Sequence, residues 1–363
     1  MIIVYLLFIF LCIRFCVTLF NFLSQPFLPQ SPKHYDDLVS ILIPARNEEN
    51  NILDLLKSLE NLNYRNFEVI IADDGSTDKT FEIIEDFILN KASFSVFKID
   101  VLPEGWLGKN NACFQLAKKA NGAYFLYLDA DETVLPEILD SAVHRMKMNR
   151  LHLLSLFCDQ EMKTLGERMV VPLMHYLLLS LLPLRLVYLS RNPSFAAASG
   201  QFMMFDAENY KREQWHKQVK NYVVEDVAIL KLMKTEKFRT ETLLANRFVS
   251  CRMYTGYQES LNGFSKNLLA GFSYNLGAMT FYFMLIYFGF IALLFFPAWF
   301  SIFALLLVAG IRIMISIISN QNIVYNLILH PLQMTSFVVV AIMSVKKYLQ
   351  KNIVWKGRNI QPG

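Results

Sequence analysis

Charged side chains are nearly absent from two long stretches of this 363-residue chain, 1–23 and 273–345. Between Ser273 and Val345 the ionisable residues other than tyrosines are Arg312 and His330. Residues 1–23 form one apolar run that Arg14 interrupts. Such long uncharged stretches exclude a purely soluble domain, and they predict that both ends of the chain lie in a membrane.

The N-terminal run also lacks the basic start and the small-residue cleavage site of a secretory signal, so residues 1–23 are expected to be an uncleaved transmembrane anchor. Residues 278–345 are expected to hold three spans, at 278–298, 299–319 and 323–345. The third contains Asn326, His330 and Pro331. Lipid tolerates these residues where protein covers them or where the segment is re-entrant.

The five cysteines show no metal-type spacing, and an odd number without a disulfide framework indicates a reducing compartment. The chain also lacks a dense basic stripe with interleaved aromatics, which excludes nucleic acid as the expected partner. Its net charge of +4 includes basic clusters at 211–220 and in the tail at 346–358. These clusters favour a membrane surface.

Two phosphate-binding signatures are missing as well. No GxGxxG follows the first expected strand, and GxxxxGK[ST] occurs nowhere in the chain. A dinucleotide-binding fold and a P-loop are therefore not supported.

The middle of the chain alternates short apolar runs with helical periods. Strands are expected at 39–43, 67–72, 95–100, 123–128 and 151–157, and helices at 50–62, 78–89, 109–120 and 136–147. A Pro-rich linker at 24–37 precedes them. Alternation of strand and helix predicts a mostly parallel α/β sheet covered on both faces.

Polar clusters follow three of these strands: "PARNEEN" after the first, "DDGSTD" after the second and "DADE" after the fourth. Each could be an ordinary turn that caps the next helix. Ligands in parallel sheets bind beyond the carboxyl ends of the strands, however, and three clusters at one edge favour a binding site.

The "DAD" turn places Asp129 and Asp131 one residue apart after a buried strand. Two bare carboxylates there would repel each other, so a cation is expected between them. Mg²⁺ or Mn²⁺ prefers hard oxygen ligands and takes its remaining ligands from water and phosphate. A diphosphate is therefore the expected ligand. If it belongs to a nucleotide, Asp73 or Asp74 could accept hydrogen bonds from the ribose or the base of that nucleotide.

The chain resembles the family 2 glycosyltransferases, which are inverting enzymes with a GT-A fold that use nucleotide diphosphate sugars. The resemblance covers about residues 38–270. It is carried, in order, by "VSILIPARNEENNI", "VIIADDGSTDKT", "GWLGKNNACFQLA", "YLDADE" and "VVEDVAI". It implies a Rossmann-like, mostly parallel GT-A catalytic domain.

The resemblance assigns roles to single residues. It implies that Asp131 is the principal metal ligand and that Asp129 contacts the ribose or the metal. It also implies a set of donor-binding positions, with Lys109 near the diphosphate: Pro44, Ala45, Arg46, Glu48, Asp73, Lys109, Asp129 and Ala130.

In the same family the aspartate of an "ED" motif is the catalytic base, which corresponds to Asp226 here. Direct displacement at the anomeric carbon needs a base opposite the leaving diphosphate. The other interpretation of Glu225 and Asp226 is an acidic helix N-terminus that favours the helix dipole.

"EGWLGKNNAC" and "YTGYQESLNGFSKN" look like the membrane subgroup of hopanoid-associated and diaponeurosporenoate (carotenoid) glycosyltransferases. "SGQFMMF" and "VWKGR" fit that subgroup, and the QxxRW motif of processive synthases is missing. The resemblance implies transfer of one sugar, from a UDP-sugar, to a lipid such as a carotenoid or other polyisoprenoid. Transfer to a glycerolipid or polyprenyl phosphate, and non-catalytic nucleotide-sugar binding, remain as alternatives.

Residues 168–187 are apolar for most of their length yet lie within the catalytic region. They could form a buried core helix, but Pro172 and Pro183 interrupt them, which favours an interfacial element that docks on the bilayer. His175 is expected to be structural.

Nucleotide sugars are cytoplasmic, so the catalytic domain is expected to face the cytoplasm of a multi-pass cell-membrane protein. The basic tail, 346–363, is expected on the same side by the positive-inside rule. Residues 323–345 are then expected to be re-entrant or interfacial; the alternative is three ordinary spans with an external tail.

Overall fold

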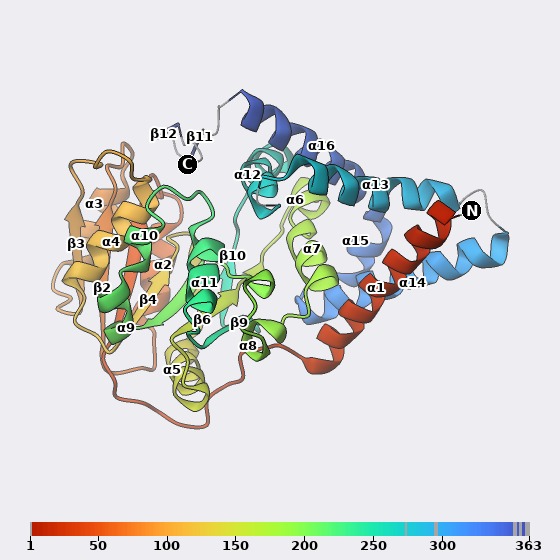
Figure 1. The fold of residues 1–363 in the computed structure, drawn as a ribbon. Helices are drawn as coiled ribbons and strands as arrows, with labels where there is room; N and C mark the ends of the chain where they lie inside the picture. Colours follow the sequence, from red (N-terminus) through yellow and green to blue (C-terminus); the bar gives the residue numbers. More distant parts are fainter. Residues whose placement is uncertain (1, 273, 294–296, 351–353, 356–357, 360–363) are drawn as a thin grey trace. The chain divides into compact units, whose positions relative to one another are not determined.

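The computed structural model describes residues 2–272, 274–293, 297–350, 354–355 and 358–359 (Figure 1). Contacts divide the chain into two compact units. Unit 1 contains residues 1–25, 160–184 and 253–353, and unit 2 contains residues 26–159, 185–252 and 354–363. The sequence predicted domains that follow one another along the chain, whereas each unit combines three separate stretches. The predicted domain boundaries stay a prediction.

Unit 2 is built on a seven-stranded sheet in the order β3-β2-β1-β4-β8-β6-β9. Its strands are β1 (Val39–Ala45), β2 (Phe67–Asp73), β3 (Phe94–Lys98), β4 (Tyr124–Leu128), β6 (Leu153–Phe157), β8 (Phe202–Asp206) and β9 (Thr240–Leu244). All neighbours pair in parallel except β8, which is antiparallel to β4 and β6. The prediction of a mostly parallel α/β sheet is confirmed, but β8 and β9 were not expected.

Helices bury both faces of this sheet. They are α2 (Ile52–Glu60), α3 (Thr80–Ile88), α4 (Gly108–Lys119), α5 (Ile138–Asn149), α9 (Ala207–Glu213), α10 (Trp215–Gln218) and α11 (Glu225–Thr235). Ile41 and Leu126 share one core with α2 and α5. On the opposite face Tyr127 packs against Tyr210, and Phe205 stacks on Trp215. Burial on both faces explains why the strands read as continuous apolar runs.

The expected linker at 24–37 is tied to the sheet in its unit 2 part. Phe27 forms a parallel bridge with Leu244 of β9, and the Leu28 N–H donates to the Leu244 carbonyl at 3.0 Å. Leu28 is buried in the core. The segment therefore extends the edge of the sheet instead of acting as a free tether.

A second, three-stranded sheet has the order β5-β10-β7. Its strands are β5 (Glu132–Val134), β7 (Asp159–Gln160) and β10 (Val249–Cys251). β5 and β10 pair antiparallel with Cys251 opposite Glu132. This pairing joins the "DADE" turn to a residue that is distant in sequence. A short helix, α8 (Leu186–Leu189), a 3₁₀ turn (Pro193–Phe195) and the antiparallel pair β11 (Val354–Trp355) and β12 (Arg358–Asn359) complete the described part of unit 2.

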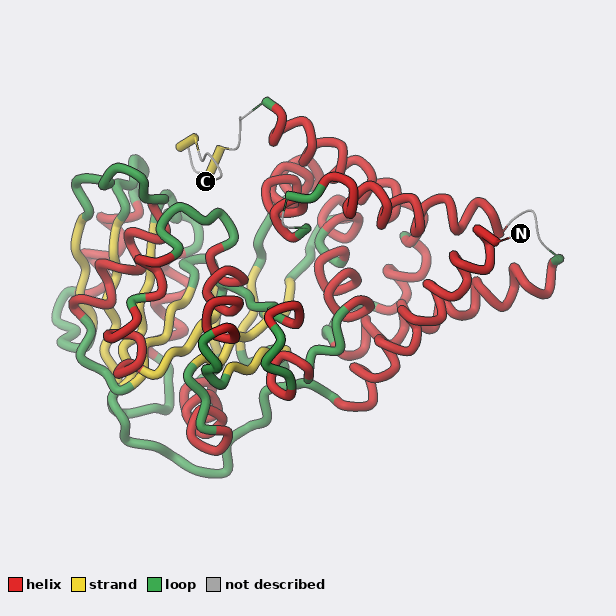
Figure 2. The backbone as a smooth tube through the Cα atoms, in the orientation of Figure 1, coloured by secondary structure: helices red, strands yellow, loops and turns green. Residues whose placement is uncertain are grey.

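Apart from Gln160 at the end of β7, the regular secondary structure of the described part of unit 1 is helical (Figure 2). Its helices are α1 (Ile2–Ser24), α6 (Leu165–Val170), α7 (Leu173–Leu181), α12 (Tyr257–Gly271), α13 (Leu276–Leu293), α14 (Ala298–Ile318), α15 (Ile323–Ile328) and α16 (His330–Leu349). The expected segment 168–187 is broken into α6, α7 and α8, and its interfacial role stays a prediction.

Three described helices are long and apolar enough to cross a membrane: Tyr5–Ser24, Ala298–Ile318 and His330–Leu349. The pair formed by α12 and α13 is bent by 115° and would be a fourth if it were one span. The expected third C-terminal span is interrupted at Leu329, between α15 and α16. Its re-entrant path, and the position of the predicted basic tail, which lies partly outside the described residues, stay predictions.

Candidate active site

The ends of β1, β2 and β4 lie at one edge of the sheet, because β1 pairs in parallel with both neighbours. Ala45 is opposite Asp73, and Leu42 is opposite Tyr127. The three polar clusters therefore follow adjacent strands. This register confirms the expectation that the three clusters lie at one edge of the sheet.

Backbone and side-chain hydrogen bonds fasten the first two clusters to each other. The Arg46 guanidinium donates to the carbonyls of Asp74 and Gly75, and the Asp74 N–H donates to the Ala45 carbonyl at 2.8 Å. The Glu48 N–H donates to Thr80 Oγ1 at 2.7 Å. Arg46 and Glu48 are thus held beside the "DDGSTD" turn, although the loop between β1 and α2 is irregular.

Asp73 is buried at the end of β2, and its two carboxylate oxygens accept from the Ser76 N–H at 3.3 Å. Gly75 has a φ of +67°, a left-handed conformation that favours glycine. The turn interpretation of "DDGSTD" is therefore correct as a description of its local structure. It does not exclude a donor-binding role for Asp73.

Lys109 joins the third cluster to a distant acidic pair. Its ammonium lies 2.7 Å from Asp129 Oδ1 and 3.3 Å from Glu225 Oε1. Burial disfavours the charge of Lys109, but Asp129 and Glu225 outweigh burial and hold the pKa of Lys109 well above its ordinary value. A fixed positive charge therefore stands at the edge where a diphosphate is expected.

Asp226 lies beside this network. Its Oδ2 accepts from the Gly200 N–H at 2.8 Å, and its Oδ1 accepts from the Val227 N–H at 2.7 Å. A Cβ at Gly200 would lie 3.2 Å from Lys109 Nζ, 3.2 Å from Glu225 Oε1 and 3.6 Å from Asp226 Oδ2. The missing side chain at Gly200 is what lets these three groups converge on the backbone.

Burial, and then the neighbouring Glu225, raise the pKa of Asp226 to about 7. A carboxylate with that pKa can exchange a proton near neutral pH, which a general base requires. An acidic residue that served only a helix dipole would be expected at an exposed position. Asp226 is half-buried, and both of its carboxylate oxygens accept from backbone N–H groups, which favours the catalytic interpretation.

The segment before Asp226 is fastened to α4. The buried Asn110 amide donates to the carbonyls of Val219 at 2.8 Å and Tyr222 at 3.0 Å, and the Leu107 N–H donates to the Lys220 carbonyl at 2.8 Å. These bonds place the start of α11 next to Lys109, the second residue of α4.

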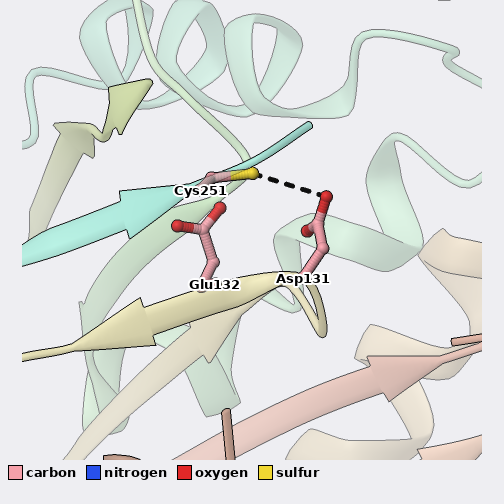
Figure 3. A group of neighbouring side chains, drawn as sticks. All are labelled: Asp131, Glu132 and Cys251. Carbon is pink, nitrogen blue, oxygen red and sulfur yellow. Dashed lines mark hydrogen bonds between the residues drawn. The ribbon is translucent and has the colours of Figure 1, made fainter. Parts of the chain in front are cut away.

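Asp131, Glu132 and Cys251 form a compact group, with one ligand atom from each within 4.8 Å of the others (Figure 3). The Cys251 thiol donates to Asp131 Oδ2 at 3.5 Å, and Gln201 Nε2 donates to Glu132 Oε1 at 2.7 Å. Burial, and then Asp131 and Asp129, raise the pKa of Glu132 well above its ordinary value. Burial raises the pKa of Cys251 in the same direction.

The chemistry of these donors decides which of them fit a hard cation. Asp131 and Asp129 are partly exposed carboxylates, which suit Mg²⁺ or Mn²⁺. Cys251 retains its proton and is a soft ligand, so it suits neither ion. The two aspartates fit the expected metal, and the thiol is placed to orient Asp131.

Sequence reasoning missed four members of this site: Glu132, Gly200, Gln201 and Cys251. Gly200 and Gln201 precede β8, whose antiparallel insertion no motif indicated. Cys251 reaches Asp131 through the pairing of β10 with β5. Pro44, Ala45 and Ala130 lie at the strand ends as expected, and they offer backbone groups instead of side-chain chemistry.

Residues 40–213 match the model of the glycosyl transferase family 2. These residues form a family 2 glycosyltransferase domain.

Its curated relatives include a 4,4'-diaponeurosporenoate glycosyltransferase of Staphylococcus haemolyticus, which is 26% identical over 248 residues. The match covers 65% of this chain and 62% of that relative. An uncharacterized glycosyltransferase of Haemophilus influenzae is 33% identical over 127 residues, 34% of this chain and 49% of the relative. The chain thus matches less than two thirds of the length of either relative.

Among solved structures, a mannosyltransferase from Pyrobaculum calidifontis in complex with GDP-Man and Mn²⁺ has a TM-score of 0.56 at 14% identity. The similarity covers 96% of this chain and 99% of that structure. At this identity the likeness establishes the GT-A fold, which confirms the fold that the sequence predicted.

Proposed function

We propose that the protein is an inverting, metal-dependent glycosyltransferase that moves one sugar from a nucleotide diphosphate sugar to a membrane lipid. The observation that carries the proposal is the convergence of Lys109, Glu225 and Asp226 at Gly200, beyond the strand ends of a family 2 domain. Asp129 joins this group through its ion pair with Lys109. The lipid acceptor rests on the helices that are apolar enough to cross a membrane.

In this reaction Asp226 accepts the proton of the acceptor hydroxyl as its oxygen attacks the anomeric carbon. The bond between that carbon and the diphosphate oxygen breaks, and the nucleotide diphosphate leaves on the opposite side with inverted configuration. The backbone N–H groups of Gly200 and Val227 keep the carboxylate of Asp226 oriented for this transfer.

The leaving diphosphate gains negative charge, and Lys109 is the side chain placed to stabilise it. On donor binding the ammonium would exchange part of its ion pair with Asp129 for phosphate oxygens. Asp131 and Asp129 would hold a Mg²⁺ or Mn²⁺ ion, which supplies further charge stabilisation when bound. Arg46, Glu48 and Asp73 would hold the nucleoside.

The acceptor class is supported by two independent features. The described helices include three that could cross a membrane, and a curated relative is named for glycosylation of 4,4'-diaponeurosporenoate, a carotenoid. A carotenoid or another polyisoprenoid is accordingly the first acceptor to test. Transfer to a glycerolipid or a polyprenyl phosphate would use the same groups.

To test this, membranes that contain the protein are incubated with Mn²⁺ and one radiolabelled donor: UDP-glucose, UDP-N-acetylglucosamine or GDP-mannose. The lipids are then extracted. Label should enter the lipid fraction with one donor and disappear with Asp226→Asn. Mass spectrometry of the labelled lipid then distinguishes a polyisoprenoid from a glycerolipid. If every donor binds but none is turned over, a non-catalytic nucleotide-sugar-binding role is the better account.

A further inference from the structure

The interior of unit 1 contains two arginines on transmembrane-type helices. Arg14 of α1 is 3% exposed, and Arg312 of α14 is 2% exposed. Both guanidinium groups face the ring of Tyr176 on α7, with Cζ at 4.5 Å and 3.6 Å from the ring centroid respectively. Two positive charges are therefore held on one aromatic side chain.

The polar contacts of these arginines are with neutral groups. Arg14 Nη2 donates to Ser180 Oγ at 2.7 Å, and Arg312 Nε donates to His330 Nδ1 at 2.8 Å. Arg312 Nη2 is buried and has no hydrogen-bond partner among the described residues. The pair thus retains one buried donor that is not used.

No acidic side chain compensates this charge in the described part of unit 1. Its three acidic residues are bound elsewhere: Glu161 faces Lys163 at 4.0 Å, Glu167 caps α6 through Thr164, and Glu259 accepts from Thr255. Cation–π contact and neutral acceptors offset only part of the cost of burying two guanidinium groups. A buried cation in an apolar helix normally has an anionic partner.

We propose that Arg14 and Arg312 form a binding site for the phosphate of an anionic membrane lipid. A guanidinium presents several N–H donors in one plane and binds phosphate oxygens with two of them, and Arg312 Nη2 is available for such a bond. Arg312 is six residues from the end of α14, about 9 Å of helix rise, so a head group at the interface is within reach of its long side chain. The site is separate from Asp226 and does not depend on the proposed reaction.

A purely structural role for the arginines predicts a different response to substitution. If they only pack on Tyr176, replacing them should destabilise the protein equally in every lipid. If they bind an anion, their uncompensated positive charge destabilises the wild-type protein when no anionic lipid is present. The double variant Arg14→Gln with Arg312→Gln should then be at least as stable as the wild type in neutral lipid and less stable than it in anionic lipid.

The experiment reconstitutes the full chain in nanodiscs of phosphatidylcholine alone or with phosphatidylglycerol and measures the unfolding temperature. We expect phosphatidylglycerol to raise the wild-type Tm by several degrees and to leave the double variant unchanged. Lys163→Gln, at a side chain that is 65% exposed in unit 1, should respond like the wild type. If the double variant does not fold, Arg312→Lys takes its place and should retain part of the shift.

Two further measurements test whether a lipid phosphate occupies the site. Phosphorus analysis of detergent-purified protein should find about one lipid phosphate per chain in the wild type and much less in the double variant. Inorganic phosphate in phosphatidylcholine nanodiscs should leave Tm unchanged; a full shift would mean that a free anion, and not a lipid, occupies the site. Equal stabilisation of the wild type and the double variant by phosphatidylglycerol would overturn the proposal. So would an ultraviolet absorption band of a Tyr176 phenolate, because the phenolate would then be the anion that compensates the two arginines.

Discussion

Asp226 combines burial with two backbone hydrogen bonds, and both affect its protonation. Because a general base acts when deprotonated, transfer should increase as the pH rises through about 7 and level off above it. Asp226→Asn should lower transfer by roughly two to four orders of magnitude while donor affinity persists. Initial rates across pH 5–9, with calorimetric donor titration, check both outcomes; near wild-type transfer by the variant would mean that another residue is the base.

The same residue links pH to stability. The folded-state pKa of Asp226 is raised above the unfolded value of about 3.9, so its contribution to stability is present below that value and lost as the pH rises through about 7. Asp226→Asn removes the charge that burial disfavours. We therefore expect the variant to have a higher Tm than the wild type at pH 8, and a much smaller difference at pH 5.

Asp131 is the side chain to which the proposed function gives the principal metal role. Asp131→Asn replaces a carboxylate by a neutral amide, a poor ligand for a hard cation, and should nearly abolish transfer and weaken Mn²⁺-dependent donor binding. Titration of donor into protein with and without Mn²⁺ measures the difference. Asp86→Asn, at an exposed position on α3, is the control and should change neither quantity.

Gly200 lies between the 3₁₀ turn (Pro193–Phe195) and β8, close to Lys109 of α4 and Asp226 of α11. Gly200→Ala would add a Cβ 3.2 Å from Lys109 Nζ and from Glu225 Oε1, closer than ordinary van der Waals contact. The side chains must then move by a few tenths of an ångström. We expect a loss of about tenfold or more in kcat with little change in Tm. Gly256→Ala, where a Cβ meets nothing within 4 Å, should leave kcat unchanged.

The elements also show how far sequence reasoning reaches. β1, β2 and β4 were predictable because each is a buried apolar run that ends in a polar turn, and local pattern is sufficient for that. The antiparallel insertion of β8 was not predictable, since "FMMFD" has the same apolar pattern in either direction. The contacts of Gly200 with Asp226, and of Cys251 with Asp131, depend on long-range pairing, which spacing along the chain does not reveal.

At the scale of the whole molecule the first question is orientation. If the donor is cytoplasmic, unit 2 must face the cytoplasm, and so should the C-terminal tail. Single cysteines at Glu236, which is exposed, and at Gly363 should resist a membrane-impermeant maleimide in intact cells and react after lysis. Labelling of position 363 alone without lysis would instead support an odd number of crossings after unit 2.

Unit 1 is assembled from three separate stretches of the chain, and this has a consequence for biosynthesis. Gln333 of α16 donates to the carbonyl of Arg168, 165 residues earlier, and also to Asn326, which in turn donates to Gln321. At about 5–20 residues per second, the ribosome needs roughly 8–33 s to make the intervening chain. During that time α7 can pack against α1, but the partners of α6 and α7 on α12, α14 and α16 have not yet been made. Membrane insertion of this protein is therefore expected to finish after translation, when the last helix is released.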